Sequence, residues 1–413
     1  MPKTSIESLY QSHPELIRFQ TEIGRPTKLG EALTIVGHPF AEPVDNQSLL
    51  RIALEQGLPL SDVETAERVI ATTGFTTRYL SHRPEQSSSP ENIVDRTTTI
   101  GAILLKETMK AKGWEDIDVF IDTSAFLPDT VNQGVLEKAG LSPDQVYTRS
   151  YRYACAGAVS AFIDCLSDPA MQNARIVIAA LEPLSHLCAP EHFSQLETIA
   201  IPSIFGDAHT LLAFTPNHFH LENKQVLVQP DGGVIKVRTL YNFQETFSEP
   251  DTIPDHYRFA NNGEGIFHHS DKGAFLDIPY PTNGSTISMD GMKTGFFFGD
   301  QTMLVMAELL NEYGNLNLLK ELGNKNVIIH PASKPVVDRI AKLLRRNPQR
   351  FLDTPNLPFL MDKAKHSNSS SATTLNRWRY MIENDLIDPR LPMFWIAPGI
   401  GSAIAGAIGW IKE

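Results

Sequence analysis

Short apolar runs alternate with longer segments of helical spacing along most of this 413-residue chain. Runs such as residues 116–121 (DIDVFI) and 175–180 (RIVIAA) are typical of buried strands. Strands separated by helices favour a sheet covered by helices, so the predicted class is α/β. The expected strands are residues 32–37, 116–121, 146–149, 175–180, 209–215, 326–329 and 393–397. The expected helices are residues 47–72, 91–113, 131–140, 156–167, 292–313, 334–347 and 372–385.

The chain length predicts roughly two to three domains or one large double domain. Two halves share the order strand, reactive turn, helix, strand, which suggests a duplicated fold. The expected parts are an N-terminal arm (1–30), a first half (31–220), a linker and insertion with little regular structure (221–285), and a second half (286–413).

Composition excludes several classes of protein. The net charge is −12, and an acidic chain lacks the basic surface that nucleic-acid binding requires. Three cysteines cannot form a disulfide framework, and the N-terminus does not have the order of a signal peptide. A cytoplasmic protein with at least one free thiol is therefore expected.

Residues 393–411 (MFWIAPGIGSAIAGAIGWI) contain no charged residue, and their length would suffice to span a membrane. Pro398 and four glycines interrupt this stretch. The pattern therefore favours a buried strand, a loop and a second buried strand, and no membrane association is expected.

Cys155 lies in the segment TRSYRYACAGAVSAFIDCL, where a strand-like run meets small residues that open a helix. The start of a helix offers free N–H groups and positive potential, which lower a thiol pKa. The N–H of Cys155 itself could also stabilise an oxyanion. The alternative is that Cys155 is a buried, small apolar residue, as we expect for Cys165 and Cys188.

Two downstream residues are candidate partners of a cysteine nucleophile. His330 ends the expected strand NVIIH, and its alternative role is a core histidine bonded to backbone. Asn368 lies in HSNSSSATT, where asparagine also commonly serves as a turn or cap residue. Gly399 and Gly401 in PGIGSA could bring backbone N–H groups close to a carbonyl oxygen.

The segments ACAGA, IFGD, IIHPAS, HSNSSSAT and PGIGSAIAGAIGW follow one another in this order. Together they resemble the thiolase superfamily, and more closely its 3-oxoacyl-acyl-carrier-protein synthase III branch with its acyltransferase relatives. The upstream segment ERVIATTGFTTRYLS resembles the same branch. The resemblance runs from about residue 30 to the C-terminus, except for residues 235–285.

The resemblance implies a homodimer with a five-layer αβαβα fold made of two similar halves. It implies that Cys155 accepts the acyl group and forms a catalytic triad with His330 and Asn368. Acyl-CoA or acyl-carrier-protein thioesters would be substrates, with no bound cofactor. The backbone N–H groups expected to form the oxyanion hole belong to Cys155, Gly399, Gly401 and Ser402. Gly206 and Asp207 match a turn that is expected to be structural.

Several positions depart from the family pattern. Arg68 and Thr72 stand where family members carry a Trp and an Arg that grip the adenine of coenzyme A. This departure favours a carrier-protein donor. The basic segment 334–350 could dock an acidic acyl carrier protein, or could simply be a solvated helix face. The residues expected at this docking surface are Arg339, Lys342, Arg345 and Arg346. His186, Cys188 and His192 match no standard zinc spacing, so no metal site is expected.

The first functional hypothesis is a synthase III-like ketosynthase, which loads an acyl group onto Cys155 and condenses it with a malonyl-type thioester. Such an enzyme would serve fatty-acid, polyketide or other secondary-metabolite biosynthesis. The second is an acyltransferase on the same fold that forms an ester or amide without decarboxylation. The third is an inactive subunit that supports a catalytic partner in a heterodimeric ketosynthase.

Overall fold

The computed structural model describes residues 5–82, 89–227, 309–345, 367–399 and 403–412, apart from residues 24, 126, 152, 189 and 324. Between these ranges it describes strand backbone at 230–231, 234–235, 258–261, 265–270, 273–279 and 288–289. It also describes the helical residues 298, 299, 302, 303, 305 and 306.

Two large sheets share one pattern of strands. From edge to edge the first is β6-β5-β7-β8-β2-β1 and the second is β16-β17-β18-β9, so that β5, β7, β8 and β2 correspond to the four strands of the second sheet. The pairs β5–β7 and β16–β17 are parallel, whereas the next two pairs in each sheet are antiparallel. The two halves are therefore similar, as predicted. The first sheet consists of β1 (Thr27–Leu29), β2 (Leu33–His38), β5 (Val119–Asp122), β6 (Tyr147–Ser150), β7 (Ile176–Glu182) and β8 (Ala208–Phe214). The second consists of β9 (Phe219–Leu227), β16 (Val327–Ile329), β17 (Met393–Gly399) and β18 (Ala403–Ile411).

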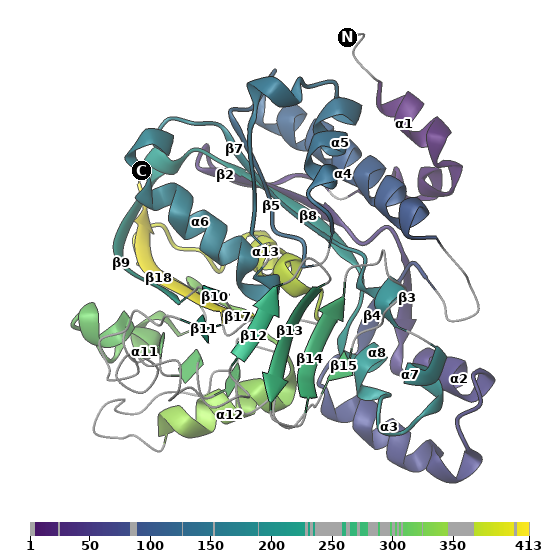
Figure 1. Cartoon of the computed structure of the whole chain (residues 1–413). Coiled ribbons are helices and arrows are strands. Elements are labelled where there is room, and N and C mark those ends of the chain that lie inside the picture. The colour runs from purple at the N-terminus through teal and green to yellow at the C-terminus, as the bar shows by residue number, and fades with distance from the viewer. Residues whose placement is uncertain are drawn as a thin grey trace.

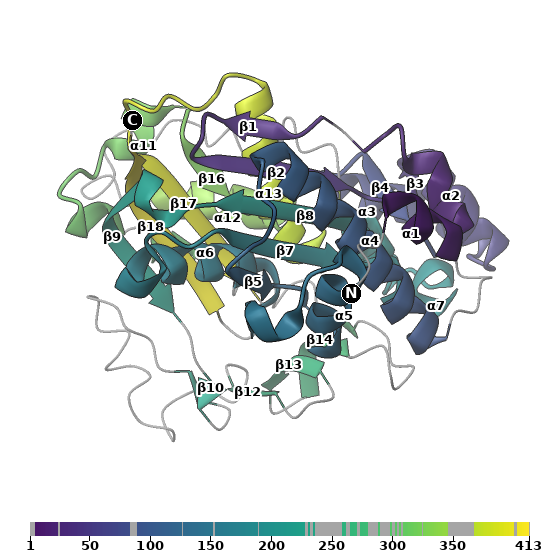
Figure 2. The same ribbon diagram turned by 90° about the horizontal axis from the view of Figure 1, so that it is seen from above.

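The helices form three layers around the two sheets (Figure 1, Figure 2). Helices α4 (Pro90–Lys112) and α5 (Thr130–Ala139) cover the outer face of the first sheet. Helices α6 (Gly157–Ser167) and α13 (Ser370–Glu383) lie between the sheets, and α12 (Lys334–Arg345) covers the outer face of the second. This arrangement is the predicted five-layer αβαβα fold. The remaining helices are α1 (Ile6–Ser12), α2 (Asn46–Glu55), α3 (Val63–Thr72), α7 (Pro190–Ser194), α8 (Ala200–Ile204) and α11 (Leu318–Leu322).

The composition of α6 explains its central position. Nine of its eleven residues are buried, and a helix that is apolar on all sides is stable only inside a protein. The ring of Phe162 lies 5.1 Å from that of Trp378 on α13 and 5.4 Å from that of Trp395 on β17. Burial of aromatic rings from both halves stabilises the contact between them.

The helix caps match the sequence. Ser89 accepts a hydrogen bond from the N–H of Asn92, which caps α4, and Gly140 ends α5 in the left-handed conformation. One expected helix, residues 47–72, is instead two helices, α2 and α3, because Pro59 lies between them. The N-terminal arm carries α1 and a 3₁₀ helix (Pro14–Phe19), which bury Leu9 and Leu16 in the core.

The expected linker and insertion, residues 221–285, contains more regular structure than predicted. Strand β9 crosses the expected boundary because β18 requires a hydrogen-bonding partner along its free edge. Four further strands form an antiparallel sheet, and their Gly-bounded segments explain the short strands. These are β12 (Arg258–Asn261), β13 (Gly265–Ser270), β14 (Gly273–Pro279) and β15 (Ser288–Met289). The same region contains a two-stranded sheet of β10 (Pro230–Asp231) and β11 (Val234–Ile235). A further two-stranded sheet, in the first half of the chain, pairs β3 (Glu42–Asp45) with β4 (Thr77–Leu80).

The uncharged C-terminal stretch forms β17 and β18 of the second sheet, as predicted, while its loop residues 400–402 lie outside the described range. Among the described residues, no helix is both long enough and apolar enough to cross a membrane.

Candidate active site

Cys155 lies in the tight 3₁₀ turn Ala154–Ala156, which leads directly into α6. Ala154 has a φ of +43°, a left-handed conformation that costs an L-residue free energy and is often retained at functional sites. The side chain of Cys155 is buried, and its thiol is not in a disulfide. The turn therefore holds a single free thiol at the start of a central helix.

Asn368 occupies the matching place in the second half. Helix α6 leads into β7, and α13, which begins just after Asn368, leads into β17. The duplication brings the starts of the two helices together, so that Cys155 Sγ lies 3.8 Å from Asn368 Oδ1. Oδ1 also accepts a hydrogen bond from Ser370 N at 2.9 Å, and Nδ2 donates to the Ala332 carbonyl at 3.3 Å. Because a backbone N–H can only donate, these bonds fix the orientation of the amide.

His330 follows β16 and is buried beside the same helix. Its Nδ1 lies 3.4 Å from Thr374 Oγ1 on α13, and its Nε2 has no hydrogen-bond partner among the described residues. A histidine retained only for packing would be expected to bond backbone through its ring, and neither nitrogen does so within the described residues. Burial lowers the pKa of His330 to about 3, so the imidazole is neutral.

Gly399 lies against the turn that carries Cys155. A Cβ at this position would lie 2.1 Å from the Tyr153 carbonyl oxygen and 2.7 Å from Ala156 N, so only glycine fits. The backbone of β17 therefore touches the turn that carries Cys155. Gly401 and Ser402, the other loop residues expected at the oxyanion hole, lie outside the described residues.

The thiol of Cys155 does not have the lowered pKa that the helix start predicts. Burial, and then the negative charge of Glu182, raise its pKa to about 12, although Ser370 and Asn368 act in the opposite direction. Desolvation of the thiolate outweighs the favourable helix start because the sulfur is buried. The thiol of Cys155 is therefore neutral at neutral pH.

Glu182, at the end of β7, was not predicted as a site residue. Its Oε1 accepts a hydrogen bond from Ser371 Oγ at 2.8 Å, and its Oε2 accepts one from Ala125 N at 3.1 Å. Burial raises its pKa to about 8. The sequence signal is one acidic residue ending a fully buried strand, IVIAALE.

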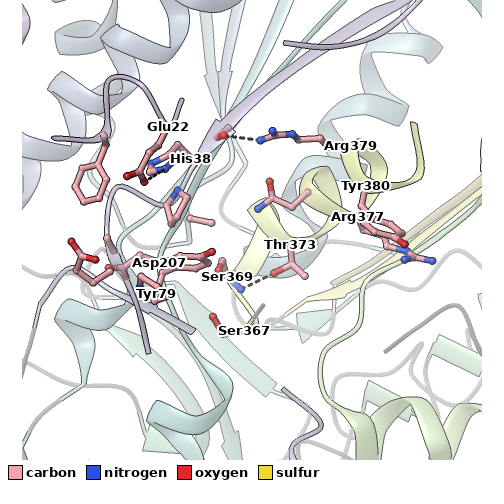
Figure 3. A pocket seen from close by; sticks show the side chains of 18 of the residues that line it. Glu22, His38, Tyr79, Asp207, Ser367, Ser369, Thr373, Arg377, Arg379 and Tyr380 are labelled. Atoms are coloured by element: carbon pink, nitrogen blue, oxygen red, sulfur yellow. Dashed lines mark hydrogen bonds and ion pairs between the residues drawn. The ribbon is translucent and has the colours of Figure 1, made fainter. Parts of the chain in front are cut away.

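A cavity of about 420 Å³ lies behind the segment that carries Asn368 (Figure 3). Ser367, Ser369 and Asp207 line one wall, and Thr373 on α13 lines another. Neither Cys155 nor His330 lines this cavity.

Three of the expected docking residues, Arg339, Lys342 and Arg345, lie on α12. Lys342 is exposed, whereas Arg339 is half-buried and its stem packs near Gly299. The side chain of Arg345 and all of Arg346 lie outside the described residues.

Arg68, at one of the positions expected to grip adenine, is exposed on α3 and pairs with Glu64. His186 stacks on His82 with ring centroids 4.6 Å apart. Within the described ranges, no group of three or more His, Cys, Asp and Glu side chains is arranged to hold a metal ion.

No protein-family model matches the sequence, and no curated protein matches it. Solved structures do match. The 1,3,6,8-tetrahydroxynaphthalene synthase of Streptomyces coelicolor, a type III polyketide synthase, has 15% identity and a TM-score of 0.64 over 94% of this chain and 99% of its own. A type III pentaketide synthase from Neurospora crassa has 14% identity and a TM-score of 0.61, and the match covers 92% of this chain and 99% of that one. The 3-oxoacyl-acyl-carrier-protein synthase III of Aquifex aeolicus has 15% identity and a TM-score of 0.57 over 94% and 99%. The chain therefore has the thiolase fold, in the form shared by type III polyketide synthases and synthase III enzymes.

Proposed function

We propose that this protein is a ketosynthase that loads an acyl group onto Cys155 and condenses it with a malonyl-type thioester. The supporting observation is the meeting of two helix starts, where Cys155 Sγ lies 3.8 Å from Asn368 Oδ1. His330 is held by Thr374 on the helix that follows Asn368. Cys155 therefore lies beside Asn368, and His330 contacts the helix that begins just after Asn368.

In the loading step, the sulfur of Cys155 attacks the carbonyl carbon of a donor thioester. A new carbon–sulfur bond forms, the donor's bond breaks, and the thiol proton leaves with the departing thiol. The N–H groups of Cys155 and Gly399 are the candidate donors for the oxyanion. Because one thioester replaces another, the step is close to balanced in free energy.

In the condensing step, the bond from the malonyl α-carbon to carbon dioxide breaks, and its electrons form an enolate. The α-carbon then attacks the acyl carbonyl, and the cysteine sulfur leaves and regains a proton. A neutral His330 can donate from Nε2 to the enolate oxygen when Nδ1 accepts from the Thr374 hydroxyl. The second N–H of Asn368 Nδ2 is the other candidate donor, since only one is used by Ala332.

The lowered pKa of His330 favours condensation over simple acyl transfer. Transfer to an alcohol or amine needs a base, and an imidazole with a pKa of about 3 is a poor base at neutral pH. Condensation needs only a hydrogen-bond donor at this position. An inactive supporting subunit would not need to retain a cysteine beside the Asn368 amide.

The test is incubation with an acyl thioester and a malonyl thioester. Release of carbon dioxide with a β-keto product is expected, and Asn368→Ala should reduce both while leaving acyl-Cys155 detectable. Transfer of the acyl group to an added alcohol or amine, with no gas released, would favour the acyltransferase instead.

We further propose that the donor is an acyl carrier protein and that the enzyme is a homodimer. Arg68 and Thr72 lack the aromatic ring expected to hold adenine, and Lys342 presents positive charge on an otherwise acidic protein.

Strand β6 forms one edge of the first sheet and exposes Tyr147, so a second copy of the chain has a strand edge with which to pair. Analytical ultracentrifugation that finds only monomer at micromolar concentration would contradict the proposed homodimer.

A further inference from the structure

The backbone of Asn368 is held by a turn from the other half of the protein. Asn368 N donates to the Ile204 carbonyl at 2.7 Å, and Gly206 N donates to the Asn368 carbonyl at 3.2 Å. Phe205 and Asn368 form an isolated parallel bridge. The position of the Asn368 side chain beside Cys155 therefore depends on where the turn 204–207 lies.

Asp207 fixes this turn to two other segments. Its buried Oδ2 accepts hydrogen bonds from Ser81 N and Ser185 Oγ, each at 2.7 Å, and its Oδ1 accepts one from Ser185 N at 2.7 Å. Its own N–H donates to the Tyr79 carbonyl at 2.8 Å. One side chain thus joins the turn to the end of β4 and to the 3₁₀ helix Leu184–Leu187.

The Asn368 segment is buried against the turn that carries Asp207. Ser367, Asn368 and Ser369 are all buried. Ser367, Ser369 and Asp207 all line the cavity of about 420 Å³ (Figure 3). Gly206 is so close to Ser367 that a Cβ would lie 2.2 Å from Ser367 Oγ. Because the contact between turn and segment is this tight, a shift of the turn would displace Asn368.

We propose that Asp207 is a positioning residue for Asn368, which aligns the amide with Cys155 without itself touching substrate. This inference rests on the proposed function for its catalytic readout and goes beyond the purely structural role expected from the sequence.

Asp207→Asn is the sharpest variant because it conserves size. The N–H groups of Ser81 and Ser185 can only donate, and each faces a different carboxylate oxygen. In either orientation of the asparagine amide, its NH₂ group faces the N–H of Ser81 or of Ser185. At least one hydrogen bond is therefore lost, and two hydrogen-bond donors face each other. The turn must then shift. A displacement of about 1 Å in a reacting group can cost ~10²-fold in rate.

A double-mutant cycle with Asn368→Ala tests the coupling. Asp207→Asn should lower the condensation rate about 10- to 100-fold in the wild-type background. It should change that rate less than about 2-fold when Asn368 is already alanine, because residues that act through one another are not additive. Equal losses in both backgrounds would overturn the proposal.

Asn326→Gly is the matched control. Asn326 is also buried, and its side chain also makes three hydrogen bonds, but all of these are to backbone groups of Asp388 and Leu391. Its variant should lower stability and leave the condensation rate of the folded protein unchanged. If Asn326→Gly lost as much rate as Asp207→Asn, a general loss of stability, and not the position of Asn368, would explain both rate losses.

A second readout does not depend on the proposed reaction. The alkylation rate of Cys155 by iodoacetamide, resolved by peptide mass, reports the contact between the thiol and Asn368. Asp207→Asn should change this rate only when Asn368 is present, and a change of equal size in the Asn368→Ala background overturns the proposal. If Asp207→Asn does not fold, Ser185→Ala removes one of the same bonds and enters the same cycle. If no thioester acylates the wild type, the proposed function fails while alkylation still tests Asp207.

Discussion

Lowering the pH should destabilise this protein steeply between pH 6.5 and pH 5. Among the residues that the structure describes, burial lowers the pKa of four histidines, and such groups are neutral in the folded state. In the unfolded chain each binds a proton as the pH falls below about 6.5. The four are His38 with a pKa of about 4, His330 with a pKa of about 3, and His186 and His209, whose pKa values lie well below 6.5.

The magnitude follows from the number of protons. A group protonated in the unfolded state alone contributes about 1.36 kcal/mol of lost stability per pH unit, and four give roughly 5.4 kcal/mol. Glu182 acts in the opposite direction, because its raised pKa of about 8 keeps a proton in the folded state that the unfolded chain lacks above pH 4.5. Four histidines less Glu182 leave three net protons, so the free energy of unfolding should fall by about 4 kcal/mol per pH unit. Burial also raises the pKa of Asp207, which acts in the same direction as Glu182.

Urea denaturation at pH 7, 6 and 5, at constant ionic strength and followed by tryptophan fluorescence, measures this slope. His209→Gln should reduce it by about 1.4 kcal/mol per pH unit, since one titrating group is removed. His220→Gln is the control, because His220 is exposed. A wild-type slope near zero, or stability that rises on acidification, would refute the claim that the folded state buries these imidazoles uncharged.

Three further predictions concern the site. Gly399→Ala places a Cβ 2.1 Å from the Tyr153 carbonyl oxygen and should lower the rate of Cys155 acylation at least about 10-fold, measured by intact-protein mass at fixed reaction times. An unchanged rate would contradict the close contact between Gly399 and the turn that carries Cys155. Glu182→Gln removes a negative charge and should shift the pH profile of Cys155 alkylation to lower pH; a shift to higher pH would reverse the assigned sign. Lys342→Glu should raise KM for a carrier-protein donor but not for the coenzyme A thioester; equal changes for both donors would remove the docking surface.

The resemblance predicted the layers of the fold, and local pattern predicted the α/β class. Residues 176–180 are apolar throughout, which predicts burial on both faces of a strand, and Pro398 with its neighbouring glycines argued against a membrane helix. Strand β9 runs across the expected boundary at residue 221, because its pairing with β18 is a long-range contact that local pattern does not contain. The division of residues 47–72 into two helices, in contrast, was indicated by the local sequence, because a proline such as Pro59 interrupts a helix.

The electrostatics of the site could not be predicted from local sequence. A helix start predicts a lowered pKa for Cys155, but burial between two halves and the charge of Glu182 depend on the assembled fold. The same holds for Asp207, whose partners Ser81 and Ser185 lie more than twenty residues away in sequence. Residue type and spacing identified the triad candidates, whereas only their surroundings indicate which protonation states they adopt.

The proposal that Cys155 carries the acyl group is tested most directly by intact-protein mass spectrometry after incubation with a panel of acyl thioesters. The wild type should gain the mass of one acyl group, Cys165→Ala should gain the same mass, and Cys155→Ala should gain none. An acyl adduct on Cys155→Ala, or no adduct on the wild type with any donor, would contradict the proposed nucleophile.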